Sequence, residues 1–91
     1  MKLMELNPNW ARKDLSQRTA ISFDCPLCKQ HRIVVPFKGE KPIWELQGDS
    51  FENMTLVPSI AHQTHYADGI GREPRLCNSH FFITKGEVVL A

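Results

Sequence analysis

The sequence predicts a mainly β fold, with a small α+β arrangement as the alternative. From Thr19 onward, short runs of branched and aromatic residues alternate with proline, glycine and asparagine, at intervals too short for helices. The chain also contains three cysteines in two short motifs, and each motif has two residues between its possible metal ligands. These observations predict zinc-stabilised antiparallel β-hairpins or a sheet, preceded by a short amino-terminal helix.

The chain of 91 residues predicts a single domain over residues 1–91. A domain this short buries only about 60% of the surface that its extended chain exposes, so its apolar core is small. With 42% hydrophobic and 23% charged residues, the composition is that of a folded protein. We therefore expect a fold that depends on a cross-link. Within it, residues 1–18 form an amino-terminal extension.

The expected elements follow the chain in order. Asn7 and Pro8 suit the cap and first position of a short helix that continues to Leu15. The expected strands are Thr19–Asp24, Arg32–Phe37, Ile43–Leu46, Met54–Val57, Phe81–Thr84 and Glu87–Leu90. Lys85 and Gly86 predict a hairpin between the last two strands, as a type I turn with a glycine bulge. The polar segment 61–75 is expected to be a long loop.

Charge and hydropathy give no signal for a nucleic-acid or membrane partner. Eleven basic and ten acidic residues give a net charge of +1, without the dense basic run that favours nucleic acid. No apolar stretch is long enough to span a membrane, and the amino terminus lacks the apolar segment of a signal peptide. The sequence thus predicts a cytoplasmic protein without a membrane partner, and it carries no clear signal for binding nucleic acid.

Two motifs of equal spacing predict a metal site. Cys25 and Cys28 flank a proline-containing turn, and Cys77 and His80 repeat the same two-residue gap before an expected strand. Three sulfurs and one imidazole nitrogen match a tetrahedral zinc site whose four protein ligands leave no open position, so one structural Zn²⁺ is expected. His31, three residues after Cys28, is the alternative fourth ligand, and its use would free His80 for chemistry.

Five sequence features carry a resemblance to a known family. They are Cys25-Pro-Leu-Cys28, Trp44-Glu-Leu with Gly48, Thr55-Leu-Val-Pro58-Ser59-Ile60, Cys77-Asn-Ser79-His80-Phe-Phe-Ile and Gly86. In this order they resemble the BubE-like family, small zinc-binding domains of phages, prophages and bacterial operons for ubiquitin-like conjugation. The resemblance extends from Cys25 to Leu90. The chain departs from the family pattern at its sparser cysteine turn, at Val57 where relatives have a second serine, and in the longer 61–75 connection.

The resemblance implies an enzymatic alternative, because some members act as serine-type peptidases that remove ubiquitin-like modifiers. Ser59, Ser79 and His80 fall on the family's serine and histidine positions. Neighbouring residues of a strand face opposite sides, so Ser79 and His80 would point apart, which favours Ser59 as the nucleophile. Its base would be His80, or His62 or His65, with Asp68 orienting a loop histidine.

Two functions therefore remain open at this point. One is a protein-interaction or regulatory module that binds a ubiquitin-like protein or a defence component in phage and bacterial conflict. The other is a zinc-supported serine peptidase that processes a ubiquitin-like modifier with Ser59 and His80 as its catalytic pair. In the first, the Ser59 hydroxyl only satisfies backbone groups after Pro58.

Overall fold

The computed structural model describes residues 1–14, 17–39, 43–66, 71 and 75–91. One 3₁₀ helix and seven strands are present in this part of the chain. They are η1 (Leu3–Leu6), β1 (Asn9–Asp14), β2 (Gln17–Asp24), β3 (Arg32–Pro36), β4 (Glu45–Gln47), β5 (Thr55–Tyr66), β6 (Arg75–Thr84) and β7 (Glu87–Leu90). The predicted mainly β class is confirmed. Within the described ranges, no helix has the length and apolar character that crossing a bilayer requires.

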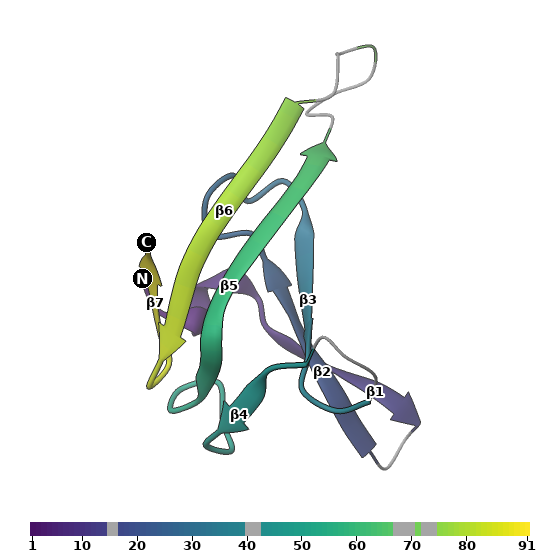
Figure 1. The fold of residues 1–91 in the computed structure, drawn as a ribbon, viewed down its shortest axis with the longest axis vertical. Coiled ribbons are helices and arrows are strands. Elements are labelled where there is room, and N and C mark those ends of the chain that lie inside the picture. Colours follow the sequence, from purple (N-terminus) through teal and green to yellow (C-terminus); the bar gives the residue numbers. More distant parts are fainter. Residues whose placement is uncertain (15–16, 40–42, 67–70, 72–74) are drawn as a thin grey trace.

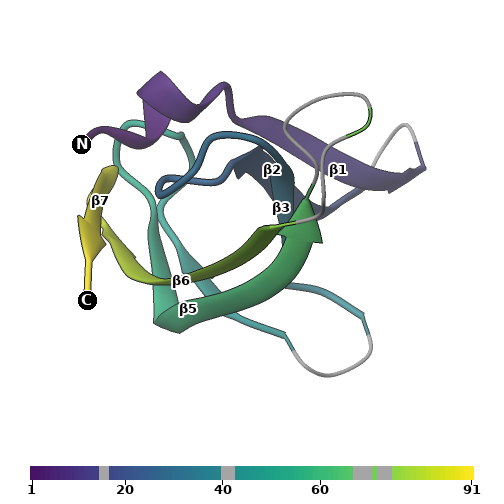
Figure 2. The ribbon, with the colours of Figure 1, turned by 90° about the horizontal axis from the view of Figure 1, so that it is seen from above.

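The strands form two antiparallel sheets. One has the order β1-β2-β3, and the other has the order β4-β5-β6-β7. The long strands β5 and β6 pair with each other at the centre of the second sheet (Figure 1). Viewed from above, β5 and β6 curve around β2 and β3, so the two sheets face each other across a shared interior (Figure 2). Every strand follows its neighbour in sequence, which is the simplest way to build antiparallel pairs.

The core lies between the inner faces of the two sheets. Buried and exposed residues alternate along β3, as expected for a strand with one face on the core. Phe23 of β2 and Phe81 of β6 meet edge to face at 5.9 Å between ring centroids, and both are fully buried. This contact joins the two sheets through apolar packing.

The amino-terminal segment covers one end of the core, next to β7. Leu3 and Leu6 of η1 are buried, and the Leu3 N–H donates to the Gly86 carbonyl at 2.8 Å. The Val88 N–H donates to the Met1 carbonyl at 2.7 Å, so the start of the chain lies along β7. Figure 2 shows the amino-terminal residues and β7 side by side. The chain therefore completes its core with its own first residues.

The β6–β7 hairpin is present where the sequence predicts it, but its turn differs. Lys85 and Gly86 connect the paired residues Thr84 and Glu87, with φ values of 49° and 78°. Two positive φ angles in a two-residue loop are typical of a type I′ turn, which matches the twist of antiparallel strands better than a type I turn with a bulge. A Cβ at Gly86 would collide with the Glu52 carbonyl, so only glycine fits there.

The amino-terminal prediction needs correction. A short helix is present, but it is the 3₁₀ turn Leu3–Leu6, and Asn7 ends it in the left-handed conformation with φ 50°. The segment predicted as a helix after Asn7 instead forms β1, which pairs along β2. The local capping signal was outweighed by strand pairing and by the burial of Trp10 against the core.

The predicted loop 61–75 is also shorter than expected. β5 continues to Tyr66 and β6 begins at Arg75, because Ala61 to Tyr66 pair in regular register with Arg75 to His80. Residues 67–70 and 72–74, including Asp68, lie outside the described residues. Polar residues had suggested a loop, but a two-stranded ribbon with an exposed face also carries them.

Candidate active site and metal centre

Three cysteines and one histidine meet at one point between the sheets. Their ligand atoms, from Cys25, Cys28, His31 and Cys77, all lie within 4.8 Å of one another. The Cys25 and Cys77 sulfurs are 3.7 Å apart. Tetrahedral zinc with Zn–S bonds of about 2.3 Å requires a sulfur separation of about 3.8 Å. The cluster can therefore hold one metal ion, and its donor atoms fit zinc.

The β2–β3 connection supplies three of these ligands. Its turn is fixed by two backbone hydrogen bonds, from the Lys29 N–H to the Cys25 carbonyl at 3.0 Å and from the Cys25 N–H to the His31 carbonyl at 2.9 Å. Lys29 adopts a positive φ of 58°, which lets the chain reverse tightly. Cys77 comes from β6 in the other sheet. A metal ion here would cross-link the two sheets.

The two buried thiols of the cluster differ in the direction of their pKa shifts. Burial raises the pKa of Cys77 to about 12, with further contributions from Cys28 and Cys25. Burial also acts to raise the pKa of Cys25, but hydrogen bonds with the backbone N–H groups of Cys28 and Leu27 and with the Ser79 and Cys77 side chains together leave that pKa below its ordinary value. A divalent cation would convert the remaining thiols to thiolates and remove the need for a buried proton.

Two polar residues line the inner side of the cluster. Ser79 is only 2% exposed, and its hydroxyl donates to the His62 carbonyl at 3.4 Å while accepting from the Cys25 thiol at 3.8 Å. The His62 ring stacks on His31 with centroids 5.2 Å apart. Burial, together with neighbouring His31, lowers the pKa of His62, so its neutral form is favoured. Ser79 and His62 thus contact candidate ligands but are not ligands themselves.

The outer face of the β5–β6 ribbon carries a different pair. The Ser59 hydroxyl and His80 Nε2 are 2.8 Å apart, a short hydrogen-bond distance. Ala61 and His80 are cross-strand partners, and Ser59 lies two residues from Ala61 on the same face. Diagonal neighbours on a sheet face are within reach of long side chains, which explains the contact. His80 is exposed and Ser59 is half-buried, so both are accessible to another molecule.

An irregularity in β5 precedes Ser59. The register changes between Leu56, opposite Ile83, and Ile60, opposite Phe81, so residues 57–59 face only residue 82 of β6. The Val57–Pro58 peptide bond in this bulge is cis. Bulges commonly lie next to active sites, where they change the direction of a side chain. Here the Trp44 indole N–H donates to the Ser59 carbonyl at 3.3 Å and supports the bulge from β4's side.

The structure separates residues that the sequence had grouped together. His80 does not join the three cysteines; His31, the alternative ligand, does. His80 instead contacts Ser59, whereas Ser79 points to the buried face. His65 is exposed at the far end of β5. Asp68 lies outside the described residues.

Sequence reasoning missed one contact of the site. Trp44 entered the prediction through the family resemblance. In the structure it is half-buried against the core, and its indole N–H donates to the carbonyl of the residue that carries the candidate nucleophile. A packed tryptophan usually finds a hydrogen-bond partner for its N–H, and this was the available signal. The partner itself, a carbonyl on another strand, depends on strand pairing.

Comparison with known proteins identifies a family. The family model of BubE, described as a bacterial ubiquitination-like system serine protease, matches residues 3–91. The match covers nearly the whole chain, so the chain belongs to the BubE family, as the cysteine, serine and histidine motifs predicted. It connects the chain with bacterial ubiquitination-like systems. No curated protein and no solved structure gives a match.

Proposed function

We propose that this member of the BubE family is a serine peptidase that cleaves a ubiquitin-like modifier from its carboxyl-terminal extension or target. Ser59 is the nucleophile, and His80 is the general base. The observation that carries this proposal is the 2.8 Å contact between Ser59 Oγ and His80 Nε2. A serine hydroxyl becomes an effective nucleophile when a base within about 2.6–3.2 Å accepts its proton.

The chemistry would follow the two-step acyl-enzyme route. Neutral His80 accepts the Ser59 proton at Nε2 as the oxygen attacks the substrate carbonyl, and it then protonates the leaving amine. Water, activated by the same imidazole, hydrolyses the ester and restores Ser59. This requires the His80 tautomer that carries its proton on Nδ1. The exposed position of His80 lets substrate and water approach both groups.

The metal site has a supporting role in this proposal. Cys25, Cys28, His31 and Cys77 would hold one Zn²⁺ ion. Four protein ligands supply a closed structural cross-link and no open position for water. Cys77 and His80 belong to the same strand, so the cross-link holds in place the segment that carries the base. Ser79, between them, faces the cross-link and cannot reach substrate.

The test is a comparison of matched variants on one substrate. The substrate is a bacterial ubiquitin-like protein fused at its carboxyl terminus to a reporter protein. Ser59→Ala and His80→Ala should each lower kcat/KM by about 10³-fold or more. His65→Ala, an exposed histidine of the same strand pair, and Ser79→Ala, the buried serine, should remain active if they retain their metal.

A fluorophosphonate probe gives a second readout without a modifier. Wild-type protein should be labelled on Ser59, as identified by peptide mass spectrometry, and His80→Ala should lose labelling. If Ser59→Ala cleaves the fusion at the wild-type rate, Ser59 is not the nucleophile. If the zinc-loaded wild-type protein neither cleaves the fusion nor reacts with the probe, the peptidase proposal is wrong, and the interaction-module interpretation of the sequence takes its place.

A further inference from the structure

An open groove lies beside the candidate active site. It has a volume of about 840 Å³ and lies where β4 approaches the first sheet. Its apolar surface comes from Trp10, Phe37, Ile43, Trp44, Leu46 and Val57. Ile43 and Val57 are 40% and 42% exposed, so the apolar surface is accessible from solvent. Such a volume is typical of sites that bind a ligand or a peptide segment.

Two aromatic residues of the groove, Trp10 and Phe37, pack against each other and against neighbouring side chains. Trp10 stacks on Phe51 with centroids 4.8 Å apart and meets Phe37 edge to face at 5.9 Å. The Arg18 guanidinium lies 4.7 Å from the centroid of the Trp10 ring. Side chains packed in this way lose little conformational entropy on binding, which favours affinity.

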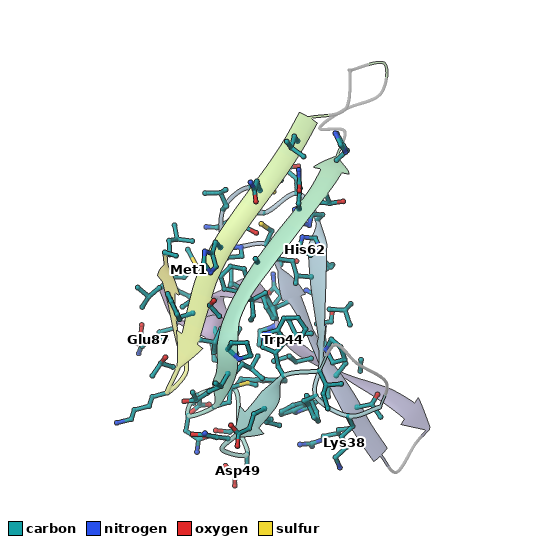
Figure 3. The ribbon with its side chains drawn as sticks, viewed as in Figure 1. Met1, Lys38, Trp44, Asp49, His62 and Glu87 are labelled. Atoms are coloured by element: carbon teal, nitrogen blue, oxygen red, sulfur yellow. The ribbon has the colours of Figure 1, made fainter. Side chains whose placement is uncertain are left out.

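The groove borders the β5 segment that carries Ser59. Trp44 lines the groove, and its indole N–H donates to the Ser59 carbonyl. Val57, two residues before Ser59, lines the groove at the start of the bulge. Figure 3 shows Trp44 beside β5, with Lys38 and Asp49 at the same end of the molecule. The apolar surface and the residue that carries the candidate nucleophile are thus joined through Trp44 and Val57.

Two further features define the chemistry of the occupant. Arg18 and Lys38 line the groove from the first sheet, whereas Glu45 and Asp49 line it from the β4 side, so neither sign of charge is selected. β4 is an edge strand, and consecutive residues of its segment line the groove. An extended polypeptide can lie beside such an edge and place a side chain in the adjoining apolar surface.

We infer that the groove is a specificity subsite that binds a bulky apolar side chain of an extended substrate segment close to the scissile bond. This inference rests on the proposed function, because it places the segment by the groove's border with the β5 segment that carries Ser59. The substrate class is thus a polypeptide with a phenylalanine-like or leucine-like residue in its tail. A tail made only of small or charged residues is a poor substrate.

The binding test uses zinc-loaded Ser59→Ala, which binds without cleaving. The chain has only two tryptophans, and both line the groove, so their indole N–H signals in NMR spectra report on it directly. The probes are acetylated and amidated pentapeptides, Gly-Gly-Phe-Gly-Gly and Gly-Gly-Ser-Gly-Gly. The phenylalanine peptide should shift both signals with a Kd at least tenfold below that of the serine peptide.

A matched pair of surface variants completes the experiment. Ile43→Glu, in the groove, should weaken binding of the phenylalanine peptide at least tenfold. Val34→Glu replaces an apolar residue of β3 that is 59% exposed and does not line the groove, and it should bind normally. The inference is overturned if neither indole signal moves, if both peptides bind equally, or if the two variants behave alike.

The same variants distinguish this inference from the proposed function. In an active Ser59 background, Ile43→Glu should lower kcat/KM for the modifier fusion at least tenfold relative to Val34→Glu. Cleavage that depends on Ser59 but not on Ile43 would refute the subsite and leave the peptidase standing. Peptide binding in the groove by a protein that does not cleave the fusion would refute the peptidase and retain the groove as a polypeptide-binding site.

Discussion

The two faces of β6 differ in what their residues contact. On the inner face, Cys77 and Ser79 are buried at the cysteine and histidine cluster that could hold a metal ion, and Phe81 is buried in the core. On the outer face, His80 contacts Ser59 and Phe82 is 45% exposed beside it. Because side chains alternate along a strand, adjacent residues of one motif are divided between structural and chemical roles. Proximity in sequence is therefore a poor guide to shared function here.

The largest effect should follow loss of an inner-face ligand. Cys77→Ala should abolish stoichiometric zinc binding and cooperative unfolding, because apparent zinc-site energies of about 10–16 kcal/mol equal or exceed the stability of a small domain. Metal analysis after gel filtration, together with circular dichroism, measures both. Metal-loaded, cooperatively unfolding Cys77→Ala would show that the cluster is not a metal site.

The second comparison replaces, one at a time, the two histidines that the sequence left as alternative fourth metal ligands. His31→Ala should lose the metal and most of the stability, since His31 lies with the cysteines. His80→Ala should keep one zinc per chain and a normal unfolding transition while losing fluorophosphonate labelling, because its ring lies on the opposite face. If His80→Ala loses its zinc while His31→Ala keeps it, His80 is the metal ligand and His31 is not.

Two neighbouring phenylalanines, Phe81 and Phe82, lie on opposite faces of β6, so their substitution should change the free energy of unfolding by different amounts. Phe81→Ala should cost about 3–5 kcal/mol of unfolding free energy, because a fully buried ring leaves a cavity. Phe82→Ala should change it by less than about 1 kcal/mol, because its ring is half in solvent. Urea denaturation of the zinc-loaded proteins gives both values. Equal costs would show that β6 does not present one face to the core.

The smallest expected effect concerns the support of Ser59. Trp44→Phe keeps an aromatic ring in the groove but removes the hydrogen bond to the Ser59 carbonyl, which is worth about 1 kcal/mol. We expect kcat for the modifier fusion to fall about fivefold with little change in KM. Trp10→Phe is the matched control, since Trp10 has no contact with Ser59 among those seen in the described residues. An equal loss in both variants would assign the effect to binding.

The sequence predicted those parts of the fold that depend on local chemistry. The cysteine turn, the strand runs from Thr19 onward and the glycine of the last hairpin all have local signals. The strand β1 was missed because Asn7 and Pro8 locally favour a helix start, whereas pairing with β2 is a long-range interaction. The extension of β5 beyond Ala61 was missed for the same reason, since only pairing with β6 orders those polar residues.

The candidate site was only partly predictable for a related reason. Spacing showed that two motifs contain ligands, but both His31 and His80 were compatible with it. Their separation depends on the direction of each side chain after the register of β5 and β6 is set. The alternation argument correctly placed Ser79 and His80 on opposite faces. The Trp44 contact required the position of β4 against the bulge, which no local pattern contains.

The pairing of the first residues with β7 has a consequence for handling the protein. An unpaired edge strand is a template on which other chains add, and β7 is the outer strand of its sheet. Met1 and Lys2 occupy its free side, through the Val88 N–H and a bridge to Glu87. Removing the first residues would thus expose the unpaired edge of β7 and promote pairing between strands of different molecules in concentrated solution.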